Sequence, residues 1–134
     1  MGFDSLRNHT KRYKKLLTKT RAISYGKLAA AIVMDTPVQY GDLRASWTPS
    51  IGANIKVENI SVNGQDAQRH DITAVINQLE WGDTFNLANG QPYARRIEHD
   101  GWSPQKAPQG MLFVNAAQWR EMVKESLHEA QGTI

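Results

Sequence analysis

Histidine, serine and carboxylate side chains are the groups in this chain that could bind a metal or perform acid–base chemistry. The four histidines stand in four separate segments, and none has a second ligand at a recognised metal-binding spacing. His99 and Asp100 are adjacent, so their side chains point in different directions in any regular element. We therefore expect solvated histidines and no metal site at His9, His70, His99 or His128.

Nucleophilic chemistry has equally little support. No Gly-x-Ser-x-Gly motif is present, and neither Ser46 nor Ser103 is expected at a strand-to-helix elbow. The chain has no phosphate-binding glycine loop, no dinucleotide fingerprint and no cysteine. The sequence thus predicts a protein that is not an enzyme and takes no cofactor. The enzyme alternative would need a cleft that gathers Glu98, His99 and Asp100 with perturbed pKa values.

Basic side chains crowd the N-terminal part of the chain. Residues 1–35 carry eight lysines and arginines against two acids, a net charge of +6, whereas residues 36–134 carry eight against eleven, a net charge of −3. This asymmetry favours contact with a polyanion, or a charge-complementary contact between copies of the chain. No recognition helix or finger spacing accompanies the charge, which argues against sequence-specific DNA binding. The candidate contact residues are Lys11, Arg12, Lys14, Lys15, Lys19 and Arg21.

Length and composition indicate one ordinary domain. The chain has 134 residues, of which 40% are apolar and 22% charged, with a mean hydropathy of −0.54. Its longest apolar run, 28–34, is far too short to cross a bilayer, and its start lacks the pattern of a secretory signal. The absence of cysteine fits a reducing cytoplasm. We expect a single domain over 1–134, with a basic helical arm at 1–27 and an α+β core at 28–130.

Hydrophobic periodicity sets the order of the elements. Apolar residues recur at helical spacing through the first 35 residues, Pro37 ends that helix, and Gly26 is expected to kink or divide it. Short strands are predicted near 47–51, over 55–62 with a bulge, and over 71–81; an exposed loop is predicted over 82–91. A short helix follows Pro92, and a final amphipathic helix begins near Trp119. This order predicts an α+β fold, with a small antiparallel sheet packed against a long N-terminal helix and a C-terminal helix.

Two segments carry the most distinctive residue patterns. Leu43 and Trp47 are four apart and can bury one shared face, as can Tyr93 and Ile97. We also expect Gly110 to let the backbone pass close to a neighbour. The segments read Thr36-Pro37-Val38-Gln39-Tyr40-Gly41-Asp42-Leu43-Arg44-Ala45-Ser46-Trp47 and Pro92-Tyr93-Ala94-Arg95-Arg96-Ile97-Glu98-His99-Asp100-Gly101-Trp102-Ser103, the latter continuing into Gln105-Lys106-Ala107-Pro108-Gln109-Gly110-Met111.

Together these segments resemble the head–tail joining, or tail-completion, protein family of long-tailed bacteriophages. In that family a helix ends in Thr-Pro-Val, an Asp-Thr-Gly-x-Leu-Arg-x-Ser stretch follows, and Tyr-Ala-x-x-Ile-Glu-x-Gly precedes Ala-Pro-x-Gly-Met. The resemblance covers about 36–117. Its motifs define a scaffold, not an active site; in this chain the matching residues are Thr36, Pro37, Val38, Gly41, Leu43, Arg44, Ser46, Trp47, Tyr93, Ala94, Ile97, Glu98, Gly101, Ala107, Pro108, Gly110 and Met111.

The resemblance implies a structural protein of the virion neck, made in the bacterial host cytoplasm. Such proteins form rings, often of six copies, and DNA passes through the lumen. The implied partners are further copies of the chain, the portal or connector-adaptor protein, and the tail terminator or tail tube protein, with no membrane contact. We expect aromatic anchors at interfaces or in the local core at Trp81, Phe85 and Trp102. The alternative is a nonspecific nucleic-acid-binding protein that uses the basic helix.

Overall fold

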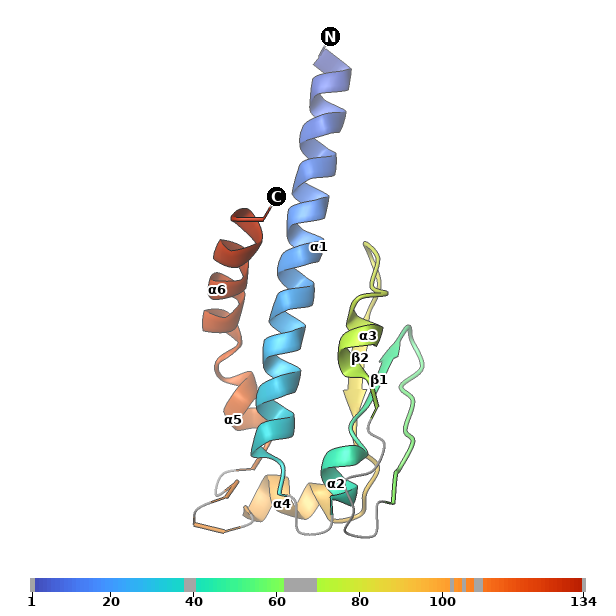
Figure 1. Cartoon of the computed structure of the whole chain (residues 1–134), viewed down its shortest axis with the longest axis vertical. Helices are drawn as coiled ribbons and strands as arrows, with labels where there is room; N and C mark the ends of the chain where they lie inside the picture. Colours follow the sequence, from blue (N-terminus) through green and yellow to red (C-terminus); the bar gives the residue numbers. More distant parts are fainter. Residues whose placement is uncertain are drawn as a thin grey trace.

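The computed structural model describes residues 2–37, 41–61, 70–101, 103–104, 106–107 and 110–133. It confirms the expected α+β fold (Figure 1). The elements are α1 (Gly2–Asp35), α2 (Asp42–Ala45), β1 (Thr48–Ile51), α3 (Ile72–Ile76), β2 (Phe85–Ala88), α4 (Ala94–Asp100), α5 (Phe113–Ala116) and α6 (Trp119–Gln131).

Helix α1 is the middle layer of the body, with α6 on one side and the two-stranded sheet on the other (Figure 1). Strands β1 and β2 are antiparallel, with Thr48 opposite Ala88 and Ile51 opposite Phe85. The ring of Tyr25 stacks on Phe85 of β2, with centroids 5.2 Å apart, and on Trp119 of α6, with centroids 5.6 Å apart. One side chain of α1 therefore joins all three layers.

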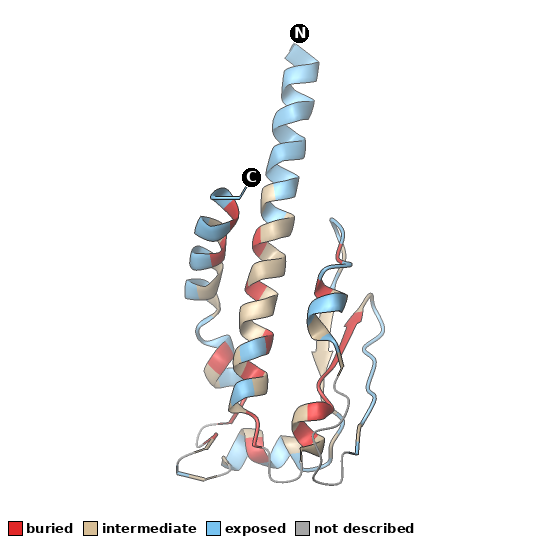
Figure 2. Cartoon of the chain, in the orientation of Figure 1, coloured by how far each residue is buried: buried red, intermediate tan, exposed pale blue. Residues whose placement is uncertain are grey.

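Helix α1 runs without a break through Gly26, so the expected kink or division is wrong. Packing on two sides holds the helix straight there, because Tyr25 lies between two rings and Lys27 forms ion pairs with Glu125 (3.2 Å) and Glu129 (2.6 Å) of α6. Residues 2–15 are all exposed, and the N-terminal end of the helix projects beyond the other elements (Figure 2). Packing against the other elements begins near residue 16, so 2–15 are the fully exposed part of the expected basic helical arm at 1–27.

The hydrophobic core lies where α1 ends, at the opposite end of the molecule from the arm (Figure 2). Leu43 and Trp47 are both buried there, as their four-residue spacing predicts. Ile97 of α4 is buried against them, whereas Tyr93 stays 37% exposed, so the expected joint burial of Tyr93 with Ile97 is wrong. The remaining buried members of the cluster are Ile32, Ala107 and Met111.

Three of the strand and loop predictions are wrong. The predicted strand over 71–81 contains α3, because Asp71 caps a helical turn by accepting the N–H of Ala74 at 2.9 Å. The predicted loop over 82–91 contains β2, whose backbone supplies the pairing partner of β1. Within the described part of 55–62, residues 55–61 form no strand ladder. The short strand near 47–51 and the last helix are confirmed, and α5 shows that the segment before that helix is helical.

Candidate functional site: the clasp at the end of the long helix

The described residues of the two motif segments, 36–47 and 92–111, meet at the C-terminal end of α1. We call this region the clasp. Thr36 is fully buried; its hydroxyl donates to the Ile32 carbonyl at 2.7 Å and accepts from the Trp47 indole N–H at 2.9 Å. Arg44 donates to the carbonyls of Met34 (3.1 Å) and Thr36 (2.9 Å). The last carbonyls of a helix lack partners within the helix, so these side chains terminate α1 by satisfying them.

Gly41 sets the position of Arg44 and Trp47. Its φ of 82° lies in the left-handed region, which a side chain opposes, and it directly precedes α2. The turn of α2 then carries Leu43 into the core and Arg44 back to the end of α1.

Glu98 of α4 is the polar centre of the second segment. Its carboxylate accepts the backbone N–H groups of Met111 (2.7 Å), Leu112 (2.7 Å) and Phe113 (3.0 Å), at the start of α5. Partial burial raises the pKa of this carboxyl, but the three N–H groups and the neighbouring His99 outweigh burial, so the pKa falls below its ordinary value. The carboxylate is therefore held ionised as a structural cap.

Gly110 permits this cap. Its φ is +89°, and a Cβ built there would lie 2.6 Å from the carbonyl oxygen of Glu98. The expected close backbone approach at Gly110 is confirmed, and its neighbour is α4. Of the other motif residues, Pro37, Ser46 and Ala107 are buried, Ala94 and Gly101 are half-buried, and Val38 and Pro108 lie outside the described residues.

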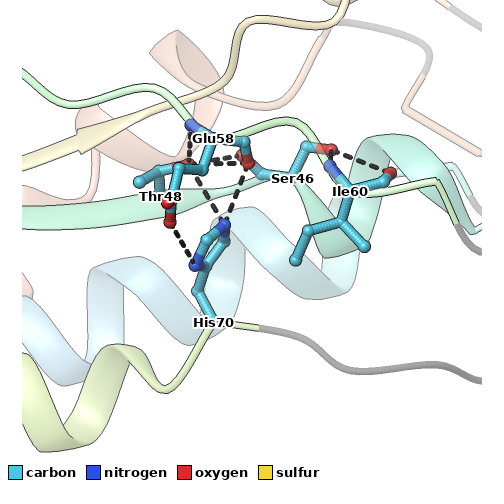
Figure 3. A network of polar contacts seen from close by, with 5 residues as sticks. All are labelled: Ser46, Thr48, Glu58, Ile60 and His70. Atoms are coloured by element: carbon cyan, nitrogen blue, oxygen red, sulfur yellow. Dashed lines mark hydrogen bonds and ion pairs between the residues drawn. The ribbon is translucent and has the colours of Figure 1, made fainter.

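A second polar cluster holds residues 56–60 against β1. The hydroxyls of Ser46, Thr48 and Ser50 accept the backbone N–H groups of Ile60 (2.8 Å), Glu58 (3.0 Å) and Lys56 (3.4 Å). We call this arrangement the hydroxyl ladder; two of its three rungs appear in Figure 3. The roles of Thr48 and Ser50 were missed from the sequence. The sequence pattern that could indicate these roles is a hydroxyl side chain at every second position of a strand.

His70 contacts the hydroxyl ladder at Thr48 and Glu58. Its Nε2 lies 2.9 Å from the Glu58 carbonyl oxygen and 3.4 Å from the Thr48 hydroxyl, and its Nδ1 lies 3.7 Å from the Glu58 carboxylate (Figure 3). The ring thus contacts backbone and side chain of one residue. This is a packing role in the body and matches no metal-ligand geometry.

The basic candidate residues divide into two groups. Lys11, Arg12, Lys14 and Lys15 are exposed on the arm, with the Lys14 ammonium 5.7 Å from the centre of the Trp81 ring. Lys19 and Arg21 lie lower and are half-buried. Arg21 donates to the carbonyls of Glu80 and Asp83, each at 2.7 Å, so it ties α1 to the turn before β2.

The candidate aromatic anchors have different environments. Trp81 is 55% exposed, whereas Phe85 is half-buried against Tyr25 and belongs to the local core. Trp102 lies outside the described residues.

A groove of about 310 Å³ opens beside the clasp. Its walls include Trp47, Glu98, His99 and Phe113, but the three hydrogen bonds at the Glu98 carboxylate occupy the group that acid–base chemistry would need. Across the described ranges, no three His, Asp or Glu side chains gather closely enough to hold a metal ion. In the same part of the chain, no helix is both long and apolar enough to cross a membrane.

No family model, curated protein or solved structure matches this chain. The resemblance to the tail-completion family therefore rests on the two motif segments, which the fold brings together at the clasp.

Proposed function

We propose that this chain is a structural protein of the phage neck, which joins or completes the tail as one member of a ring around the DNA channel. Its motif residues form hydrogen bonds and core contacts, as a scaffold requires. Its role is then assembly. The binding energy comes from one contact that repeats between neighbouring copies and closes them into a ring by rotation. This proposal includes the virion neck as location and assigns no enzymatic activity or cofactor.

The observation that carries the proposal is the exposed arm of α1. Residues 2–15 form a helix in which every residue is exposed, and Phe3, Leu6 and Tyr13 lie on one of its faces. Isolated helices of this length are marginal in water, and large exposed apolar stripes mark interaction sites. A helix with these properties is suited to contact an adjacent subunit.

We propose that the arm's partner is a neighbouring copy in the ring. The net charge of +6 on residues 1–35 and of −3 on the remainder favours a head-to-tail contact. On the arm, Arg7, Lys11 and Lys15 follow each other at four-residue steps. On α6, exposed acids follow at the same steps at Glu121, Glu125 and Glu129.

The test is deletion of the gene in a phage that carries it, followed by electron microscopy of the particles. We expect filled heads and complete tails that fail to join. Complementation with the full chain should restore joining, and the triple variant Arg7→Glu, Lys11→Glu and Lys15→Glu should not. Normal infectious particles after deletion would contradict the proposal.

Nonspecific nucleic-acid binding is the second candidate, because four exposed basic residues lie close together at Lys11, Arg12, Lys14 and Lys15. Binding of this kind weakens steeply with salt, since each phosphate contact releases counterions. Fluorescence anisotropy with duplex DNA at 50 and 200 mM salt measures this. Tight, salt-dependent binding by a chain whose deletion leaves particles intact would favour this candidate over the neck role.

A further inference from the structure

We propose that residues 55–59 form an open strand edge that pairs antiparallel with the same residues of a second copy. This inference concerns the body of the molecule and is independent of the arm and of the neck role. It rests on the hydroxyl ladder, on the backbone groups that the ladder leaves outward, and on the charges beside them.

The hydroxyl ladder shows that residues 56–60 are extended. Its rungs join Ser46 to Ile60, Thr48 to Glu58 and Ser50 to Lys56, so each step of two residues along β1 matches two residues in the opposite direction. Because the two segments advance in equal steps, residues 56–60 have the same rise per residue as β1, which is the rise of a strand. Side-chain hydroxyls thus replace the backbone partner that a strand would normally have.

Only alternate backbone groups are used by the ladder. In an extended chain the N–H and C=O of successive residues point to opposite sides, so those of Ile55, Val57 and Asn59 point away from β1. Among the described residues, none of these N–H and C=O groups has a hydrogen-bond partner. All three residues are exposed, Ile55 at 64% and Val57 at 51%.

An exposed edge of this kind is normally protected. Pro49 at the centre of β1 shows one form of protection, because proline has no N–H to offer a further strand. Residues 55–61 contain no proline, and the side chains beside their open groups include two large aliphatic ones. Such an edge is a ready site for strand addition.

The charges favour a second copy as the partner. If Val57 lies opposite Val57 of the partner copy, the outward groups at 55, 57 and 59 face each other and can form about six hydrogen bonds. Lys56 then lies directly opposite Glu58 of the other copy, and this pairing occurs twice because the contact is two-fold symmetric. The segment is therefore complementary to itself in charge and in backbone register.

The first test is a disulfide at the symmetry axis. The chain has no cysteine, so Val57→Cys introduces a single thiol. Residues opposite each other in a hydrogen-bonded antiparallel pair have Cα atoms about 5.5 Å apart, within the range of a disulfide. Under mild oxidation of the full chain, we expect a covalent dimer that forms at least about tenfold faster than that of the control Ala53→Cys, which is also exposed but lies about eight residues out of register. Equal rates for the two variants would overturn the proposal.

The second test exchanges the charges. Lys56→Glu and Glu58→Lys each place like charges opposite one another, so we expect each variant to dimerise about tenfold more weakly than the unchanged chain in sedimentation equilibrium. A mixture of the two variants, or the double variant, restores opposite charges and should recover the affinity. Circular dichroism melts verify the fold of each variant.

Three results would overturn the pairing: a chain that stays monomeric up to about 1 mM, a dimer whose affinity the single exchanges leave unchanged, or a mixture that does not recover it. A Val57→Pro variant gives a separate check, because Val57 donates no hydrogen bond within the described residues. It should lose the dimer while its melting temperature stays close to that of the unchanged chain.

Discussion

Glu98 acts at the start of α5 as a helix cap, but it comes from another helix. Its three backbone donors lie 13 to 15 residues further along the chain, so the carboxylate fixes how α4 and α5 meet as well as where α5 begins. A cap from a distant residue couples local helix formation to the tertiary fold. At the residue scale, the motif Ile-Glu thus has a structural explanation without catalysis.

Glu98→Gln keeps the shape of this side chain and removes its charge. Hydrogen bonds to charged groups are worth more than neutral ones, so we expect the free energy of unfolding at pH 7 to fall by about 1–3 kcal/mol. Urea titration measures the loss. An unchanged unfolding midpoint would show that the three N–H groups find equivalent partners in the variant.

The same substitution predicts a pH dependence. The pKa of Glu98 is lower in the folded chain than its ordinary value of 4.5. Its stabilisation is therefore fully present above pH 4.5 and is lost as the pH falls through the folded pKa. The difference in melting temperature between the unchanged chain and Glu98→Gln should shrink from pH 6 to pH 2.5. A constant difference would indicate that ionisation of Glu98 contributes nothing.

Gly110→Ala should be strongly destabilising, for two separable reasons. The left-handed φ of +89° is costly for alanine, and the new Cβ would meet the Glu98 carbonyl oxygen at 2.6 Å. Gly82→Ala is the matched control, since Gly82 has a φ of +90° and open space around it. We expect about 1 kcal/mol for Gly82→Ala and at least about 2 kcal/mol more for Gly110→Ala in chemical denaturation. Equal losses would leave φ as the only cost.

The elements differ in how far the sequence predicts them. Helix α1 and helix α6 follow from their apolar periodicity, and α4 follows from Pro92. The sheet is less predictable from the sequence, because β2 lies in a polar, loop-like stretch and is defined by its pairing with β1. For 71–81, alternation at Ile72, Ala74 and Ile76 favoured a strand, yet Ile72 and Ile76 also share a helical face, and the Asp71 cap decides for the helix.

For the clasp and the hydroxyl ladder, prediction from the sequence is likewise limited to contacts between residues close together in the chain. Burial of Leu43 and Trp47 follows from spacing within one turn. The hydrogen bond from Trp47 to Thr36 and the cap from Glu98 join separate elements, so no local sequence pattern predicts them. Partners that lie far along the chain need the fold before they can be named.

Gly26→Ala should stabilise α1. Gly26 lies within an unbroken helix, and no atom outside the helix backbone comes within 4 Å of where a Cβ would stand. Alanine loses less conformational entropy than glycine in a helix, so we expect the free energy of unfolding to rise by about 0.5–1 kcal/mol. Guanidinium denaturation with an unchanged slope would support this. A loss of stability would mean that the helix bends at Gly26 in solution.

At the scale of the whole molecule, we expect the arm to contribute little to the stability of the body. Deletion of residues 2–12 removes side chains that are all exposed, so the melting temperature of the body should stay within about 2 °C of the full chain. Differential scanning calorimetry measures this. The control is deletion of residues 2–27, which also removes the Tyr25 ring between Phe85 and Trp119 and should unfold the body. A large loss from the shorter deletion would assign the arm a role in folding.

The position of α1 between the two other layers makes it a lever. About 20 Å of helix extends beyond its packed half, which is held by the ring stack at Tyr25, by the Lys27 ion pairs and, at its end, by the core. A sideways contact at the free tip therefore acts on the packed half of the same helix. The far end of the rod is anchored in the core, where the Thr36 hydroxyl accepts the Trp47 indole N–H. One unbroken helix thus connects the exposed tip at one end of the molecule with the core at the other.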